Sequence, residues 1–274
     1  MSNRRLLSMD RAQRRRDWTP AQKSGTLQPW DRRRHGSVPL PVPRSRASAG
    51  RPAIRGEALL MTAKAKTPEE TYAPALARAT ERLAQSDPAL MAARAGVSLE
   101  RHVSGRLHFS VPFFGTPYHV HWPTGNVQRG ADQAQPDITT HILLLHYLLT
   151  ADGTAMASNW IAFRSLPGGL GYDAAFERRA NFRLGQRFGS DGPAFEAAVR
   201  TMSGERLAFG DLSFSLRALP CCWLAVVLHL ADDEFPASAN VLFDGSACHY
   251  LPTEDLAILG GMLSSNLIRA AHTP

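Results

Sequence analysis

The sequence predicts an α+β fold, with one mixed or mainly antiparallel sheet packed by several helices and preceded by a disordered basic segment. Apolar side chains alternate with polar ones in residues 107–111, 118–122 and 212–217, which is typical of strands with one buried face. Runs with apolar residues three and four positions apart lie before, between and after these strands, which is typical of amphipathic helices. The third observation is a change of composition near residue 60.

Residues 1–60 hold 14 Lys/Arg and 4 Asp/Glu, whereas the remaining residues hold 17 and 20. The N-terminal segment is also rich in Pro, Ser and Arg and has almost no apolar periodicity, so residues 1–66 are predicted to be disordered. Alternatively, Met61 is the true start and the segment is not translated. Residues 67–274 are predicted to form a single, mildly acidic domain, for which no specific nucleic-acid binding is expected.

The predicted domain opens with two helices and a hairpin. Helical spacing of apolar residues begins at Pro68, and Ser86-Asp87-Pro88 supplies a cap and a first-turn proline for a second helix that ends near Gly96. The alternating runs 107–111 and 118–122 then flank a short turn, which predicts two paired strands with one buried face.

The other face of this hairpin gathers three histidines, namely His108, His119 and His121. Two imidazoles two residues apart on a strand can share a metal ion, and a third from the partner strand completes three ligands. These histidines are therefore candidate metal ligands. The alternative is that the rings contact only solvent.

In the middle of the domain, a helix that is apolar almost all round ends at Leu149, and residues 159–164 are predicted to form a strand. A glycine-rich turn at 166–171 leads into a helix at residues 172–188. Three arginines, Arg179, Arg183 and Arg187, form one stripe of that helix. They either reach a phosphate or an acidic partner, or cover the core edge with their charged ends in solvent.

The C-terminal third predicts a short helix at 193–202, the strand at 212–217, and a near-continuous apolar strand at 221–230 that is buried on both faces. A hairpin of residues 240–244 and 247–251 is predicted around Asp244-Gly245. The final helix begins at Thr253, and its buried stripe is predicted to comprise Leu256, Leu259, Leu263 and Leu267, with Gly260 allowing close packing.

Charged residues cluster where predicted strands end. If these ends converge, they form an acidic pocket with one guanidinium, suited to a cation, an amine or a basic surface. The candidate ligand-binding residues are Arg164, Asp232, Asp233, Glu234 and Asp244. The alternative is that the acidic turns are simply solvated.

Enzymatic activity stays open, because paired carboxylates such as Asp233 and Glu234 can perform acid/base chemistry when one is buried. No nucleophile elbow, catalytic triad or phosphate-binding loop is recognisable. The three cysteines lack the Cys-x-x-Cys spacing of a cluster site. No apolar run approaches the roughly 20 residues that span a bilayer, so a cytoplasmic location is expected.

Several motifs, in this order, resemble one known family. They are Leu143–Leu149, Trp160–Gly169, Asp232–Pro236, Val241–Asp244 and Tyr250–Asp255. Over roughly Pro68 to Ala270 the chain is similar to the domain of unknown function 3786 family, which has no established activity. The resemblance implies an accessory or ligand-binding role linked to corrinoid or iron–sulfur one-carbon metabolism, with a protein partner from such a system. This chain lacks the four-cysteine motif often found beside the family, so the resemblance implies no electron-carrying role here.

Overall fold

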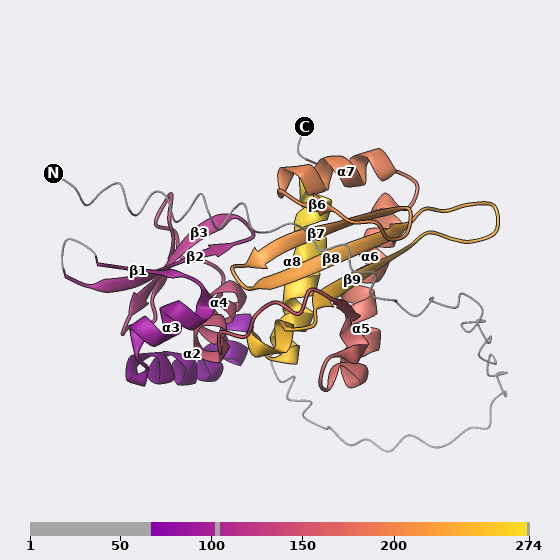
Figure 1. Cartoon of the computed structure of the whole chain (residues 1–274). Helices are drawn as coiled ribbons and strands as arrows, with labels where there is room; N and C mark the ends of the chain where they lie inside the picture. The colour runs from indigo at the N-terminus through magenta and orange to yellow at the C-terminus, as the bar shows by residue number, and fades with distance from the viewer. Residues whose placement is uncertain (1–66, 102–104, 273–274) are drawn as a thin grey trace, which may run out of the picture. The chain divides into compact units, whose positions relative to one another are not determined.

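The computed structural model describes residues 67–101 and 105–272. Helices and antiparallel sheets make up these residues, which confirms the predicted α+β class (Figure 1). The predicted disorder of residues 1–66 lies outside the described residues, and so does the choice between the two start positions.

The first sheet has four antiparallel strands in the order β1-β2-β3-β4. They are β1 (Ser98–Arg101), β2 (Leu107–Phe113), β3 (Thr116–Trp122) and β4 (Val127–Arg129). Phe109 in β2 pairs with Val120 in β3, and both side chains are fully buried. The predicted hairpin and its buried face are therefore confirmed. The edge strands β1 and β4 are too short for their alternation to be recognised in the sequence.

Three helices pack beside this sheet, namely α2 (Pro68–Gln85), α3 (Pro88–Ala95) and α4 (Ile138–Thr150). The Thr67 side chain and Glu70 form a capping box at the start of α2, and the Asp87 carboxylate caps α3. The indole N–H of Trp122 donates to the carbonyl of Leu83 at 3.2 Å, which ties β3 to α2. The helix α4 is the apolar helix predicted from the sequence, and most of its residues are buried.

The second sheet has five antiparallel strands in the order β5-β9-β8-β7-β6. They are β5 (Trp160–Ala162), β6 (Glu205–Arg206), β7 (Leu212–Leu219), β8 (Cys222–His229) and β9 (Ser238–Asp244). The apolar strand β8 lies at the centre, between β7 and β9, and nearly all of it is buried. Its predicted central position is confirmed.

The prediction of a single sheet is wrong, because the strands divide into two sheets. The turn between β2 and β3 reaches β7, where the N–H of Phe114 donates to the carbonyl of Ala218 at 2.8 Å. Alternation identifies which residues form strands, but pairing between distant strands depends on tertiary contacts that the pattern does not contain. One connected set of buried apolar side chains includes residues from both sheets.

Four helices accompany the second sheet, namely α5 (Asp173–Arg179), α6 (Asn181–Phe188), α7 (Gly192–Thr201) and α8 (Thr253–Ala270). The four predicted leucines of α8 are fully buried, so its stripe is confirmed. The helix predicted at 172–188 is instead broken at Ala180, which has φ −112° and ψ −71°. The carbonyl of Ala180 accepts from the N–H of Leu184 at 3.3 Å and from the Ser264 hydroxyl on α8 at 2.8 Å.

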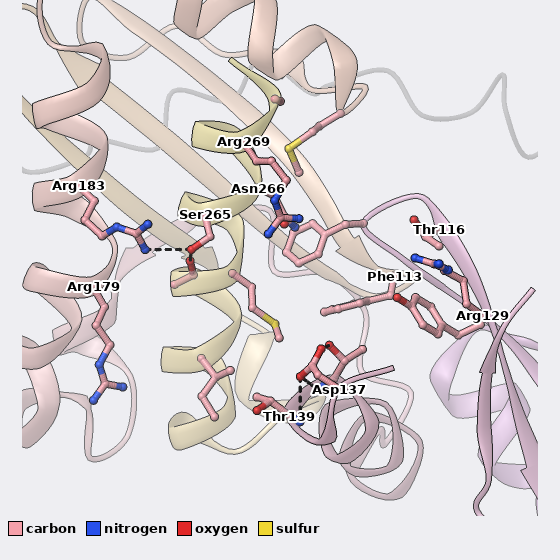
Figure 2. Close-up of a pocket in the computed structure, with 18 of the residues that line it drawn as sticks. Phe113, Thr116, Arg129, Asp137, Thr139, Arg179, Arg183, Ser265, Asn266 and Arg269 are labelled. Atoms are coloured by element: carbon pink, nitrogen blue, oxygen red, sulfur yellow. Dashed lines mark hydrogen bonds between the residues drawn. The ribbon is translucent and has the colours of Figure 1, made fainter. Parts of the chain in front are cut away.

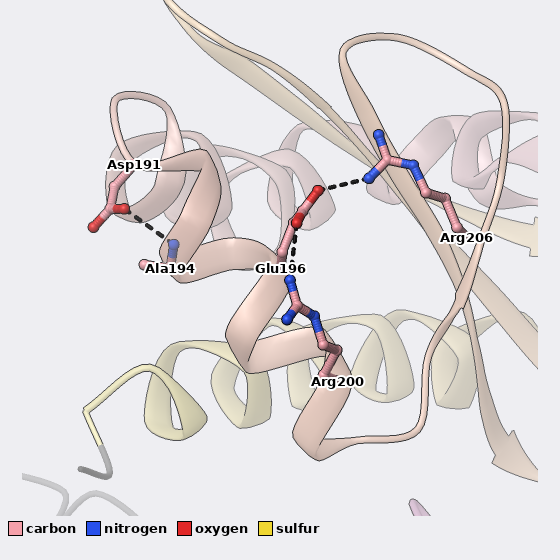
Figure 3. Close-up of polar contacts among 5 residues, drawn as sticks. All are labelled: Asp191, Ala194, Glu196, Arg200 and Arg206. Carbon is pink, nitrogen blue, oxygen red and sulfur yellow. Dashed lines mark hydrogen bonds and ion pairs between the residues drawn. The ribbon is translucent and has the colours of Figure 1, made fainter.

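Side-chain contacts hold α7 at its start and at its middle (Figure 3). The Asp191 carboxylate accepts from the N–H of Ala194 at 3.0 Å and caps the helix. Glu196 accepts from Arg200 on the same helix at 3.0 Å and from Arg206 on β6 at 2.6 Å. The short edge strand β6 is thus tied to α7.

Two local predictions near β9 need correction. Residues 247–251 do not form the second strand of a hairpin, because η4 (Ala247–His249) is a 3-10 turn. The predicted strand at 159–164 is shorter, since η2 (Phe163–Ser165) follows β5 and η3 (Gly169–Tyr172) precedes α5. Both changes place turns rather than strands around the buried end of β9.

Candidate functional site

The structure does not bring the five predicted ligand-binding residues together. Asp232, Asp233 and Glu234 lie in the loop before β9, whereas Asp244 ends this strand. A strand of seven residues is about 20 Å long, so these carboxylates stand at opposite ends of β9. Figure 1 shows the loop between β8 and β9 extending away from the sheet.

Asp244 has a structural role. Its side chain is 1 % exposed, and its carboxylate accepts hydrogen bonds from the N–H groups of Ala157, Ser158 and Ser246, each at 2.9 Å. The Ser246 hydroxyl also donates to it at 2.6 Å. These four donors occupy the carboxylate and anchor the segment before β5, so Asp244 is not open to a ligand.

The remaining members of the predicted set are exposed. Asp232 caps its own turn by accepting from the N–H groups of Glu234 and Phe235 at 2.9 and 2.7 Å. Asp233 and Glu234 are exposed, so neither lies in the enclosed setting typical of a catalytic acid or base. Arg164 lies in η2, where its Nε is 4.0 Å from Asp173 Oδ2.

The three histidines do come together on the face of the first sheet opposite the core. His108 pairs with His121 across β2 and β3, and the ring centroids of His108 lie 4.8 Å from His119 and 5.9 Å from His121. His108 Nε2 is 3.4 Å from the Glu100 carboxylate. Burial, together with the neighbouring His119, lowers the pKa of His108 below its usual value.

The geometry does not support the metal site predicted for these histidines. Within residues 67–101 and 105–272, no group of three His, Cys, Asp or Glu side chains is arranged to hold a metal ion. The Nδ1 atoms of His108 and His119 are buried and have no hydrogen-bond partner, and the Nε2 of His121 is 3.0 Å from the Gln128 side-chain oxygen. The rings contact one another rather than converging on one point.

A different set of residues surrounds a cleft of about 840 Å³ between the four-stranded sheet and the helices that accompany the second sheet. Its walls come from the β2–β3 hairpin, the start of α4, the junction of α5 and α6, and the end of α7, while α8 forms its floor (Figure 2). This volume lies within the roughly 300–1,000 Å³ of small-molecule sites. The cleft is therefore the best candidate site.

Arginines dominate the charge of the cleft. Four of them line it, namely Arg129, Arg179, Arg183 and Arg269. The one acidic residue in the lining, Asp137, accepts from the N–H groups of Thr139 and Thr140 at 3.0 Å and from the Thr140 hydroxyl at 2.7 Å. Its carboxylate is thus occupied as the N-terminal cap of α4.

The arginines differ in their partners. Arg129 forms an ion pair with Asp132, which lowers the pKa of that carboxyl group to about 2. Arg183 Nη1 donates to the Ser265 hydroxyl on α8 at 2.9 Å. Arg179 has no hydrogen-bond or ion-pair partner among the described residues. Figure 2 shows Arg179 and Arg183 on the same side of α8.

Apolar and aromatic side chains form the rest of the lining. Phe114 and Tyr118 are half-buried and flank the buried Phe113, with ring centroids at 4.8 and 6.2 Å from it. Met202, Ile258 and Met262 add aliphatic surface. The cleft can therefore hold a molecule that has both a negative charge and an apolar body.

Sequence reasoning found only one wall of this cleft. The stripe of Arg179 and Arg183 was visible, with a phosphate or an acidic partner as one of its two interpretations. The facing wall comes from residues 113–140, which no local pattern connects to this helix. Arg187 belongs to the same stripe but lies away from the cleft, 3.8 Å from Asp191.

Comparison with known protein families shows which family this chain belongs to. Residues 87–266, more than half of the chain, match the domain of unknown function family DUF3786. The chain belongs to this family. Comparison with curated proteins and with solved structures gave no significant match.

The part of the chain that matches DUF3786 includes all of the cleft except its end at Arg269 and Ala270. It also includes the three cysteines, of which Cys222 is buried and none forms a disulfide. Among the described residues of this DUF3786 protein, no helix is long and apolar enough to cross a bilayer.

Proposed function

We propose that this DUF3786 domain is a ligand-binding module that holds an anionic organic molecule in the arginine-lined cleft. The observation that supports this most is the charge of the lining, in which Arg179 and Arg183 have no carboxylate partner among the described residues while the one aspartate is occupied as a helix cap. Concentrating one sign of charge in a cleft raises the local concentration of oppositely charged ligands.

The arrangement of Arg179 and Arg183 adds to this. Arg179 is the last residue of α5 and Arg183 lies in α6, and both line the cleft on the same side of α8. Neither has a carboxylate partner among the described residues. A ligand oxyanion would supply the missing counter-charge.

Calorimetric titration of the full chain with benzoate, phenyl phosphate, decanoate and the neutral benzyl alcohol tests the proposal. We expect the anions to bind and the alcohol to bind much more weakly, with affinities that fall as salt is added. Binding should weaken by at least about tenfold in the Arg179→Ala/Arg183→Ala double variant, since one lost charge-assisted hydrogen bond is worth about 1.5–3 kcal/mol.

The neighbouring Arg178→Ala is the matched control, because Arg178 is an exposed arginine of α5 that does not line the cleft. It should bind the anions as the unchanged protein does. Equal weakening in both variants would show a general charge effect and contradict the proposal, as would the absence of binding to every anion.

We also propose the accessory role in corrinoid or iron–sulfur one-carbon metabolism, which is supported by the resemblance alone. Absorption spectra of the purified protein, recorded after incubation with a corrinoid and removal of the excess, test it directly. A retained corrinoid band is the expected result. A protein without the band would leave the binding module without this metabolic link.

A further inference from the structure

We propose that the arginine-lined cleft is also a docking site for a second copy of this chain, which inserts its acidic turn, residues 232–235 between β8 and β9. This inference goes beyond the proposed small-molecule function, because it assigns a protein partner to the cleft. It follows from where two arginines meet α8, from what the acidic turn presents, and from the match between their charges.

Arg179 and Arg183 meet α8 at two separate points. A Cβ placed on Gly261 would lie 4.0 Å from the Cβ of Arg179, and Arg183 Nη1 donates to the Ser265 hydroxyl at 2.9 Å. These points are one turn of α8 apart, or about 6 Å. Figure 2 shows the two side chains at successive levels on one side of α8. A short segment that carries two negative charges can therefore meet one arginine with each.

The same helix supplies apolar surface beside the arginines. Ile258 and Met262 lie one turn apart on α8, line the cleft and are half-buried. Apolar side chains of this kind gain stability when a partner removes them from water. The side of the cleft along α8 therefore suits a partner that carries an apolar side chain next to its negative charges.

The acidic turn has this combination. The Asp232 carboxylate accepts from the N–H groups of Glu234 and Phe235 at 2.9 and 2.7 Å, and its own N–H donates to the carbonyl of Phe235 at 3.0 Å. Asp233 and Glu234 are thus held at the tip, both are exposed, and Phe235 next to them is 44 % exposed. Because the turn is already closed by hydrogen bonds, it loses little conformational freedom when it binds.

The charges of the turn and of the cleft are complementary. Within the described part of the chain, the carboxylates of Asp233 and Glu234 have no hydrogen-bond or ion-pair partner, and Arg179 and Arg183 have no carboxylate partner. Complementary charges of this kind guide two surfaces together and fix how they meet. The chain thus carries both halves of one contact, with two carboxylates for two guanidiniums and a ring for the apolar surface.

The acidic turn lies away from the cleft of its own chain. The N–H of Ala231, just before the turn, donates to the carbonyl of Gly189 at 3.0 Å, after α6 has ended. The described lining of the cleft includes no residue of the turn, and Figure 1 shows this loop extending away from its sheet. The contact is therefore between copies. It joins two different surfaces, so it closes into a ring or continues from copy to copy.

Sedimentation velocity of the full chain, over protein concentrations from micromolar to millimolar, tests the inference. One inserted turn buries a small area, so the association should be weak and should appear only in the upper part of this range. We expect the average mass to rise with concentration at low salt. The rise should shrink at high salt, because salt screens contacts between exposed charges.

Reversal of the charges identifies the two surfaces. Asp233→Lys/Glu234→Lys and Arg179→Glu/Arg183→Glu should each weaken self-association at least about tenfold. An equimolar mixture of the two variants should associate again, because each lysine-bearing turn then meets a glutamate-bearing cleft. A general loss of folding cannot produce this recovery.

Two control variants have the same changes of charge at exposed residues outside the cleft and the turn, namely Glu81→Lys/Glu205→Lys and Arg78→Glu/Arg178→Glu. Both should associate as the unchanged protein does. Equal weakening in the controls would show an effect of net charge and would overturn the inference.

Three further results would also overturn it. The first is an unchanged protein that stays monomeric at every concentration, the second is self-association that responds to only one of the two reversed pairs or to neither, and the third is a mixture that does not recover. None of these affects the proposed function, which depends on calorimetric binding of benzoate. A protein that associates as expected but binds no small anion would contradict the proposed function alone.

Discussion

The two sheets share one core but differ on their opposite faces. The four-stranded sheet presents ionisable groups there, with Glu100 and three histidines in mutual contact. The corresponding face of the five-stranded sheet carries small neutral side chains at its centre, namely Ser213, Ser215, Ala225 and Val227, all of them buried, with the ionisable Glu205, Arg217 and His229 around them. The sheets should therefore contribute similarly to stability through the core, while pH should act mainly on the four-stranded sheet.

The shared core predicts the largest effects. Phe109→Ala in the first sheet and Phe243→Ala in the second remove fully buried rings, so each should lower the free energy of unfolding by about 3–5 kcal/mol. Urea unfolding followed by circular dichroism and by tryptophan fluorescence should give one coincident transition in both variants. Two separate transitions, with each variant shifting only one, would show that the sheets are independent.

The next largest effect is expected where α8 packs against its neighbours on the second sheet. A Cβ at Gly260 would lie 2.5 Å from Phe176 and 3.3 Å from Phe243, so Gly260→Leu should destabilise the protein by about 1–3 kcal/mol through overpacking. Gly261→Ala is the matched control, because the nearest atom to its Cβ, on Arg179, is 4.0 Å away. That variant should gain up to about 1 kcal/mol of helix propensity. Equal melting temperatures for both variants would refute the close packing.

The buried carboxylate at the end of β9 should have an effect of similar size, through hydrogen bonds rather than packing. Asp244→Asn removes one acceptor oxygen and leaves a buried N–H without its partner, which should cost about 1–3 kcal/mol. Asp233→Asn, in the exposed loop at the other end of the strand, should stay within about 0.5 kcal/mol of the unchanged protein. Urea midpoints measure both. A large effect at Asp233 would restore a role for that loop.

The smallest expected effect is the pH dependence of the first sheet. Because the folded state lowers the pKa of His108 below 6.5, the folded protein binds fewer protons than the unfolded chain. The stability contributed by neutral His108 is thus complete above pH 6.5 and is lost as the pH falls below it through the folded pKa. Glu100 opposes this loss, and His119 and His121 increase it.

Thermal unfolding of the unchanged protein and of His108→Gln between pH 7.5 and pH 5 checks this. The unchanged protein should lose more stability than the variant as the pH falls. Parallel curves would show that His108 does not titrate within the cluster, and they would remove the difference in pH response between the two sheets.

The α+β class and most helices could be predicted from local patterns. The leucine stripe of α8 and the apolar run of β8 each predict which of their side chains are buried. This is possible because the repeat of a helix or strand decides which side chains share a face, whatever element packs against it. The break at Ala180 could not be predicted, since the residues around it keep helical spacing and the interaction that accompanies it comes from Ser264. The same limit applies to His146, whose ring pairs with the Asp255 carboxylate at 2.5 Å across a separation of 109 residues.

By itself, the sequence determined which segments form helices and strands, which of their faces are apolar, and that three histidines share one face of a hairpin. Only the tertiary structure decided that the strands divide into two sheets, that Asp232 and Asp244 stand at opposite ends of one strand, and that Arg183 lines the same cleft as Arg129. The physical reason is that periodicity records the burial of each element separately. A site depends on which faces of distant elements pack together, and that is settled by the shared core.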